Sequence, residues 1–252
     1  MNFQDIHVRY GNKPVLNGVS FSLKPGALTA MIGRNGCGKS TLVGCVGGTV
    51  PYTGLITEGG LPLAGMTRRE RARLVAILPQ VLLSPHVTVE ELVGYGRNPY
   101  LPFGARFSDN DRQAVEWAAE ITEVKPLWEK YVDRLSGGER QKVYLAMILA
   151  QTTSLLLLDE PSTYMDPGYE YGFMQMLSRL AHEEGKTVLV VTHDLTQAFT
   201  VADQIVAMED GKVIFCGSPE RCAAEGVTER LFRLKTHFVM EDGARNTYFS
   251  QV

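Results

Sequence analysis

Residues 33–41 read Gly-Arg-Asn-Gly-Cys-Gly-Lys-Ser-Thr, which satisfies the spacing G-x-x-x-x-G-K-[ST]. Glycines in this pattern let the backbone turn tightly, so that successive N–H groups can point at phosphate oxygens. Lys39 would reach the β and γ phosphates of a nucleotide, and the Ser40 hydroxyl would bind Mg²⁺. An apolar strand-like segment precedes the loop and helix-forming sequence follows it, so a phosphate there would also meet a helix N-terminus. The stretch therefore predicts a P-loop fold that binds and hydrolyses Mg-ATP.

Two adjacent carboxylates end the apolar run of residues 155–158. The carboxyl ends of parallel strands line the ligand crevice of an open α/β sheet, which is also where a phosphate loop lies. Asp159 is then placed to hold Mg²⁺ through water, and Glu160 to polarise or deprotonate an attacking water. A pair of surface carboxylates at a strand end is the alternative, and the phosphate loop makes it the weaker one.

A second glycine-containing helix start occurs at residues 135–141, Leu-Ser-Gly-Gly-Glu-Arg-Gln. Ser136 occupies the N-cap position, and capping alone would explain a serine there. Gly137 and Gly138 would also leave backbone N–H groups open to an approaching phosphate. An enzyme with a single phosphate loop does not need such a second anion site, so this segment asks for a further explanation.

The order of strand-like and helical segments indicates an α/β fold. Strands are expected at five short segments: residues 8–10, 19–23, 28–32, 154–158 and 186–192. A turn at Gly11-Asn12 separates the first two, and helical sequence at residues 168–184 separates the last two. Strands that alternate with helices indicate a parallel sheet with crossover connections.

The stretch from about residue 62 to residue 150 has a helical texture instead. Capping boxes are expected at Thr67–Glu70 and at Ser108–Asp111. Near the C-terminus, Asp242-Gly243 is a turn signal that predicts a hairpin over residues 236–250. The expected architecture is a P-loop NTPase core built from two segments with a mainly helical subdomain between them: residues 1–80 and 152–252 for the core, and 81–151 for the subdomain.

Composition and charge narrow the class of protein. A chain of 252 residues, 44% hydrophobic and 21% charged, is typical of an ordinary globular protein. The formal net charge of −3 gives no reason to expect a nucleic-acid partner, because such partners normally require a basic footprint. An arginine-rich run at residues 68–73 is interrupted by Glu70, and we expect it to be a solvated helix face.

The sequence also indicates a compartment. No segment reaches the roughly 20 consecutive apolar residues of a membrane span, and the N-terminus lacks the features of a signal peptide. The cysteines show no zinc-ligand spacing, so free thiols in a reducing compartment are expected. This holds for Cys37, Cys45, Cys216 and Cys222.

Together the motifs resemble those of the nucleotide-binding subunits of ATP-binding-cassette (ABC) transporters, over essentially the whole chain. LSGGERQ is the most specific of them. The resemblance identifies residues 33–41 as the Walker A loop and 155–160 as the Walker B strand. It also makes Gln80 in ILPQ the Q-loop glutamine, His193 in VTHD the switch histidine and residues 162–166 the D-loop, where Tyr164-Met165 departs from the common Ala-Leu.

The resemblance implies a site built from two copies of the chain that pair head to tail. Ser136 and Gly138 of one copy would cover the γ-phosphate that Lys39 of the other binds. ATP would close this pair, and hydrolysis with phosphate release would open it. The implied catalytic residues are Glu160, His193, Lys39 and Gln80. The implied Mg²⁺ ligands are Ser40, Gln80 and Asp159. The implied ATP contacts are Tyr10 (stacking on adenine), Gly33, Asn35, Gly36, Gly38, Lys39, Ser40, Thr41, Ser136, Gly137 and Gly138.

Within the family, residues 88–100, TVEELVGYGRNPY, resemble the ATPase subunits that power import of iron–siderophore complexes. Haem and cobalamin importers are similar. The resemblance implies that an integral-membrane permease docks on residues 80–107 and that a substrate-binding protein delivers the cargo. The chain would then lie at the cytoplasmic face of the inner membrane as a peripheral subunit. The docking candidates are Glu90, Tyr95, Arg97 and Tyr100, with packing inside the lobe as the alternative.

Two other classes compete. A non-transport ABC ATPase, such as one that serves iron–sulfur assembly or DNA maintenance, would share most of these motifs. Its DNA-maintenance members carry long coiled-coil insertions that this chain lacks. A P-loop kinase or GTPase is disfavoured by LSGGERQ and by the absence of a guanine-reading Asn-Lys-x-Asp. Cys37 adds an expectation of its own, that alkylation of its thiol would affect the ATPase.

Overall fold

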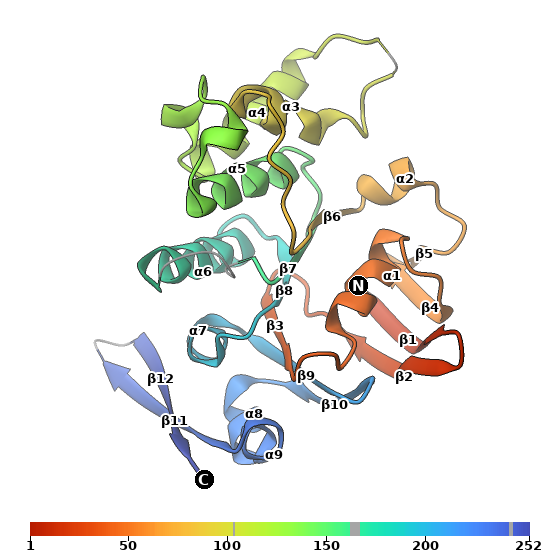
Figure 1. Ribbon diagram of the computed structural model, residues 1–252, viewed down its shortest axis with the longest axis vertical. Coiled ribbons are helices and arrows are strands. Elements are labelled where there is room, and N and C mark those ends of the chain that lie inside the picture. Colours follow the sequence, from red (N-terminus) through yellow and green to blue (C-terminus); the bar gives the residue numbers. More distant parts are fainter. Residues whose placement is uncertain (103, 162–166, 242–243) are drawn as a thin grey trace.

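The computed structural model describes residues 1–102, 104–161, 167–241 and 244–252 (Figure 1). Among these residues, six strands form the main sheet in the order β10-β9-β3-β8-β7-β6. All neighbouring pairs are parallel except β10 with β9. The strands are β3 (Leu28–Gly33), β6 (Val75–Leu78), β7 (Leu155–Asp159), β8 (Thr187–Val191), β9 (Gln204–Glu209) and β10 (Lys212–Gly217).

The central strands β3, β7 and β8 are buried along their whole length. A parallel strand that is covered on both faces needs apolar side chains throughout, which explains the uninterrupted apolar runs in the sequence. In β3, Leu28, Ala30 and Ile32 pack into one core, whereas Met31 packs into the other. The expected parallel sheet with crossovers is confirmed.

Each face of the main sheet has its own cover (Figure 1). Helices α6 (Pro167–His182) and α7 (Leu195–Val201) pack on one face. Helix α1 (Lys39–Gly47) and a smaller antiparallel sheet pack on the other. The order of that smaller sheet is β2-β1-β4-β5. Its strands are β1 (Asn2–Tyr10), β2 (Lys13–Ser22), β4 (Thr53–Glu58) and β5 (Leu61–Pro62).

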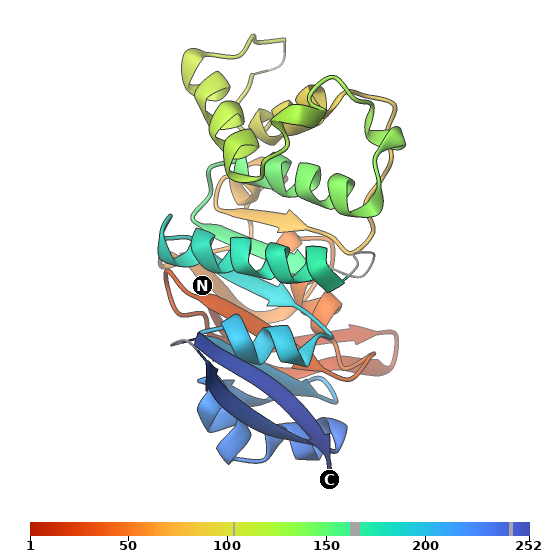
Figure 2. The same cartoon turned by 90° about the vertical axis from the view of Figure 1, so that its left-hand side faces the viewer.

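Short helices fill most of the segment between β5 and β7, and α3, α4 and α5 gather at one end of the molecule (Figure 2). They are α2 (Arg68–Ala72), α3 (Val89–Gly94), α4 (Asp109–Ile121) and α5 (Gly137–Leu149). The capping boxes expected at Thr67 and Ser108 are confirmed, and so is the N-cap at Ser136. The residue boundaries of a core and a helical subdomain stay a prediction.

Two details of this segment differ from what the sequence predicted. Val75–Leu78 is a strand, β6, which extends the main sheet beside β7. Four residues are too few for an apolar periodicity to distinguish a strand from a helix. Arg71 does not belong to a solvated face, because its guanidinium donates to the carbonyls of Cys45, Val46 and Leu63.

The chain ends in α8 (Pro219–Ala224), α9 (Val227–Phe232) and a hairpin of β11 (Leu234–Glu241) and β12 (Ala244–Gln251). The predicted hairpin is confirmed, although its turn at residues 242–243 lies outside the described residues. Phe199 of α7 packs against Phe238 and Phe249 of the hairpin. None of the described helices combines the length and the apolar composition that a membrane crossing requires.

Gly96 offers a test of this packing, together with Gly172 as its control. A Cβ on Gly96 would collide with the backbone carbonyl of Met147 and lie 2.9 Å from the Cβ of Ala150, whereas one on Gly172 in α6 would meet nothing within 4 Å. We expect Gly96→Ala to lower the free energy of unfolding by about 1 to 3 kcal/mol through overpacking. Gly172→Ala should raise it by up to about 1 kcal/mol through helix propensity. Urea titrations followed by circular dichroism would measure both, and equal effects would contradict the packing.

Candidate nucleotide site

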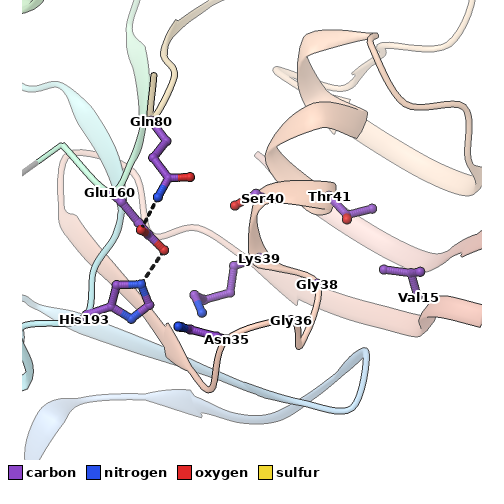
Figure 3. A pocket seen from close by; sticks show the side chains of 10 residues that line it. All are labelled: Val15, Asn35, Gly36, Gly38, Lys39, Ser40, Thr41, Gln80, Glu160 and His193. Atoms are coloured by element: carbon purple, nitrogen blue, oxygen red, sulfur yellow. Dashed lines mark hydrogen bonds and ion pairs between the residues drawn. The ribbon is translucent and has the colours of Figure 1, made fainter. Parts of the chain in front are cut away.

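The phosphate loop runs from the end of β3 to the start of α1 and borders a cleft of about 310 Å³ (Figure 3). Polar and charged side chains from four separate segments meet there. The lining residues are Val15, Asn35, Gly36, Gly38, Lys39, Ser40, Thr41, Gln80, Glu160 and His193. The structure therefore brings together most of the residues that the sequence assigned to the phosphates and to catalysis.

Two glycines are needed for the shape of the loop. Gly33 has φ of +153° and Gly38 has φ of +107°, values that L-residues rarely adopt. A Cβ on Gly33 would also collide with the carbonyl of Met208, and one on Gly38 would lie 2.6 Å from the side chain of Leu16. Backbone and core atoms therefore leave no room for a side chain at either glycine.

Lys39 is held inside the loop by the loop's own backbone. Its Nζ donates to the carbonyl of Gly33 at 2.8 Å and to that of Arg34 at 3.3 Å, and the side chain is buried. Both acceptors are neutral. A phosphate oxygen in the cleft would be an anionic acceptor, and such charge-assisted bonds are roughly twice as strong. The Lys39 ammonium therefore already lies at the loop, where a phosphate oxygen in the cleft would be a stronger acceptor than the two carbonyls.

Ser40 lines the cleft, and Asp159, which is buried and not among the lining residues, is joined to it by a hydrogen bond. The Ser40 hydroxyl donates to Asp159 Oδ1 at 3.2 Å. Burial raises the pKa of the Asp159 carboxyl above its ordinary value, and the Ser40 hydrogen bond lowers it in part. Mg²⁺ in nucleotide sites is held by one or two protein oxygens together with phosphates and water, so this donor pair fits it. The described residues contain no cluster of three or more His, Cys, Asp or Glu that would hold a metal without a nucleotide.

Glu160 is the convergence point of three segments (Figure 3). Its Oε2 accepts from Gln80 Nε2 at 2.5 Å, and its Oε1 lies 2.5 Å from His193 Nε2. Its backbone has φ of +49°, and its N–H bonds to the carbonyl of Val191 at 3.0 Å. Such backbone conformations cost about 1 to 3 kcal/mol and cluster at functional sites. The turn directs the carboxylate into the cleft, where it can accept a proton.

Other assigned residues lie away from this cleft. Ser136 caps α5, and Ser136, Gly137 and Gly138 are not among the residues that line the cleft. Tyr10 ends β1 and is 55% exposed. The predicted D-loop, residues 162–166, lies outside the described residues. One chain therefore carries two separate groups of assigned residues, which is the arrangement that a head-to-tail pair would need.

Comparison with known proteins agrees with this geometry. The sequence matches the family described as "ABC transporter" over residues 16–163, more than half of the chain. The chain belongs to the ABC transporter family. It is an ATP-binding subunit that hydrolyses ATP. Its fold is the ABC nucleotide-binding domain, so the predicted fold class is confirmed.

Two curated relatives of this ABC ATPase illustrate the similarity. The iron(3+)-hydroxamate import ATP-binding protein FhuC of Bacillus subtilis is 35% identical over 243 residues, which cover 96% of this chain and 90% of the relative. The hemin import ATP-binding protein HmuV of Streptomyces coelicolor is 37% identical over 232 residues, which cover 90% and 81%. A dimeric ATP-binding cassette, solved in a post-hydrolysis state with ADP and Pi, aligns with a TM-score of 0.75 and 25% identity over 86% of this chain and 98% of that one.

The loop after Gln80 lies inside the stretch 80–107 that the sequence analysis assigned to docking, and it exposes two apolar residues that were not named as candidates. Val81 is 69% exposed and Leu83 is 74% exposed. The loop is tied to α5, since Tyr144 donates to the carbonyl of Leu83 and Arg140 to the hydroxyl of Ser84. The signal that could have singled out Val81 and Leu83 is the run of three apolar residues, 81–83, directly after the glutamine and between two prolines.

The four docking candidates of the sequence analysis differ in exposure: two are exposed, one is buried and one is half-buried. Glu90 and Tyr95 are exposed. Arg97 is buried and forms an ion pair with Asp111 at 2.8 Å, so its assignment to a docking surface was wrong. Tyr100 is half-buried, and its hydroxyl donates to the carbonyl of Gln151. An arginine in a short helical segment gives no local indication that its charge is paired 14 residues away.

Cys37 belongs to the phosphate loop, and its burial bears on the expectation that alkylation of its thiol would affect the ATPase. The thiol is 6% exposed, burial raises its pKa, and the Lys39 charge lowers it only in part. Burial also raises the pKa values of the other three thiols, to about 12 for Cys45 and Cys222.

Because only the thiolate reacts, we expect Cys37 in the native ABC ATPase to be modified by N-ethylmaleimide at pH 7 at least about tenfold more slowly than in the unfolded chain. The rate should increase as the pH rises toward the elevated pKa. Peptide mass spectrometry of timed samples measures the rate, and modification at the unfolded-chain rate would contradict this placement of the thiol.

Proposed function

We propose that this ABC ATPase is the energising subunit of an importer that takes up an iron–siderophore complex through an integral-membrane permease. The convergence of Gln80, Glu160 and His193 on the phosphate loop carries the enzymatic part of the proposal. The relatives that serve iron-hydroxamate import, together with residues 88–100, support the cargo class. Haem is the second candidate, because the hemin importer subunit has a comparable identity, 37% over 90% of this chain.

In the proposed mechanism, the loop residues from Gly33 to Thr41 bind the phosphates through backbone N–H groups, and Lys39 pairs with the β and γ phosphates. The exposed ring of Tyr10 stacks on adenine. Mg²⁺, when bound, would neutralise phosphate charge, held by Ser40, by Asp159 through water, and by Gln80. The amide nitrogen of Gln80 bonds Glu160, which leaves its oxygen on the side of Ser40 (Figure 3).

Glu160 is proposed as the general base. A water oxygen attacks the γ-phosphorus, the bond to the ADP oxygen breaks, and the water proton passes to the Glu160 carboxylate. Gln80 and His193 each contact one oxygen of that carboxylate, so they fix the direction in which it accepts. His193 is 45% exposed and lines the cleft, so its ring also faces the space in which the γ-phosphate would lie.

Pairing with a second copy completes the proposed site. Ser136, Gly137 and Gly138 at the amino end of α5 would approach the γ-phosphate held by the partner. A helix N-terminus with free N–H groups favours an anion. Dimerisation of a related cassette supports this arrangement. A substrate-binding protein would act on the permease and not on this chain.

The first test replaces Glu160 by Gln. A positioned general base typically contributes about 10²- to 10⁴-fold, so we expect turnover to fall by that factor while ATP binding persists. Coupled-enzyme assays and binding of a fluorescent ATP analogue measure the two quantities. Glu183→Gln, an exposed carboxylate at the end of α6, is the matched control and should keep wild-type turnover. Retained turnover in Glu160→Gln would remove Glu160 from the role of base.

The second test identifies the partner. A tagged Glu160→Gln chain purified from solubilised native membranes with ATP should recover a polytopic permease, identified by mass spectrometry. If Val81 and Leu83 form part of the docking surface, Val81→Ser/Leu83→Ser should reduce that recovery about tenfold, while the exposed control Leu61→Ser should not. If only soluble partners are recovered, and the wild-type chain hydrolyses ATP, the result would favour a non-transport ABC ATPase instead.

A further inference from the structure

The carboxyl end of α5 is held by side chains from the segment around residue 97, at the opposite end of the helix from Ser136. Arg97 Nη1 donates to the carbonyl of Ala150 at 2.7 Å and to the hydroxyl of Thr152 at 3.2 Å. The Tyr100 hydroxyl donates to the carbonyl of Gln151 at 2.8 Å. The last carbonyls of a helix have no partner within the helix, and a cation there is favourable. These contacts also fix the exit of the chain toward β7.

Arg97 is itself rigidly placed. Its Nε bonds Asp111 Oδ1 at 2.8 Å, and both side chains are buried. Asp111 in turn closes the capping box of Ser108 at the start of α4. The Tyr100 ring lies 4.2 Å from the Arg97 guanidinium in a cation–π contact. A buried charge pair of this kind tolerates little movement, because separation of either partner would leave an uncompensated charge.

Helix α2 and the residue that follows it also bind this segment. Arg69 and Arg73 both donate to the carbonyl of Pro99, at 2.8 and 2.9 Å, and Arg69 also donates to the carbonyl of Leu101. The Arg73 guanidinium lies 5.4 Å from the Tyr100 ring. Between these two arginines, Arg71 bonds the carbonyls of Cys45 and Val46 at the end of α1. Helix α1 is the helix that begins at Lys39 of the phosphate loop.

We propose that Arg69, Arg73, Arg97 and Tyr100 form a clasp that fixes the carboxyl end of α5 relative to α1, and that they are positioning residues for ATP hydrolysis. The clasp connects the phosphate-loop helix to the helix that begins at Ser136. None of its residues lines the nucleotide cleft. The inference rests on the proposed head-to-tail pairing, because only in a pair does the amino end of α5 meet a phosphate.

The length of α5 explains how a clasp at its carboxyl end affects the position of Ser136 at its amino end. The 13 residues of α5 span about 20 Å at 1.5 Å per residue. A tilt of about 5° at the clasped end would move the Ser136 end by about 2 Å over that length. Misplacement by about 1 Å can cost about 10²-fold in rate. A loosened clasp should therefore weaken the contribution of Ser136 and Gly138 to the partner's site and leave the chain's own phosphate loop intact.

A contribution to stability alone is the competing explanation for these contacts. Arg69 and Arg73 are exposed, and their partners are carbonyls of a surface segment. Single hydrogen bonds to such groups contribute only modestly to folding. The exposed pair is therefore the right place to break the clasp, since the buried Arg97 and Asp111 stay intact and the chain should still fold.

The test compares Arg69→Ala/Arg73→Ala with Arg68→Ala, an exposed arginine of the same helix. For the double variant we expect binding of a fluorescent ATP analogue to the isolated chain within about twofold of wild type. Its steady-state kcat should fall about three- to tenfold. Hydrogen exchange at residues 150–152 should become about tenfold faster, because the segment that holds these carbonyls is loosened. Arg69→Lys/Arg73→Lys should recover at least half of the loss, because each lysine can still donate to one carbonyl.

Tyr100→Phe removes only the bond to Gln151. Its kcat should therefore fall, and exchange at residues 150–152 should become faster, by smaller factors than in the double variant. Unchanged kcat and exchange in the double variant would overturn the clasp, and so would a kcat loss of equal size in Arg68→Ala. The pairing is tested separately in wild type, whose specific activity should rise with chain concentration. If it does not, the proposed pairing fails, and exchange at residues 150–152 still decides whether the clasp exists.

Discussion

The register of three buried parallel strands determines where the chemistry lies. Val191 at the end of β8 pairs with Met31 of β3 on one side and with Asp159 of β7 on the other. The residues that follow these positions must therefore emerge at one edge of the sheet. They include the phosphate loop, Glu160 and His193. A shift of one strand by one residue would turn its side chains to the opposite face and separate the carboxylate from the loop.

That register is stable because both faces of the three strands are buried. Every residue of β3, β7 and β8 is covered, one face by α5, α6 and α7 and the other by α1 and the small sheet. The polar edge of the sheet can then hold strained and partly desolvated groups. The left-handed backbone of Glu160 and the raised pKa of Asp159 are two such features, and both lie where strands end and apolar packing stops.

The sequence predicted the parts of the fold and site that local signals encode. Glycine spacing identified the phosphate loop, apolar runs identified the buried strands, and a serine or threonine three residues before an acid identified the helix starts. It did not predict the strand at Val75–Leu78, which is too short for periodicity. It also did not predict the φ of +49° at Glu160, which accompanies a bond from its N–H to Val191, 31 residues away. The pairing of Arg97 with Asp111 and with the end of α5 depends on contacts 14 to 55 residues apart. No local pattern carries such information.

The two ends of α5 differ in charge, and this difference matters for an incoming phosphate. At the amino end, the Glu139 carboxylate accepts from the Ser136 N–H at 2.9 Å, and that bond lowers the pKa of Glu139, so the group is anionic at neutral pH. Lys130, whose Nζ lies 3.4 Å from Glu139, offsets part of this charge. The capping carboxylate of Glu139 therefore already occupies the Ser136 N–H and adds a negative charge near an incoming phosphate. The remaining donors for the phosphate are the N–H groups of Gly137 and Gly138, which no side chain of their own covers. Attraction at this end then depends on short-range hydrogen bonds, which require the helix start to be placed within a fraction of an ångström. Placement of that kind is something that a rigidly held carboxyl end can provide.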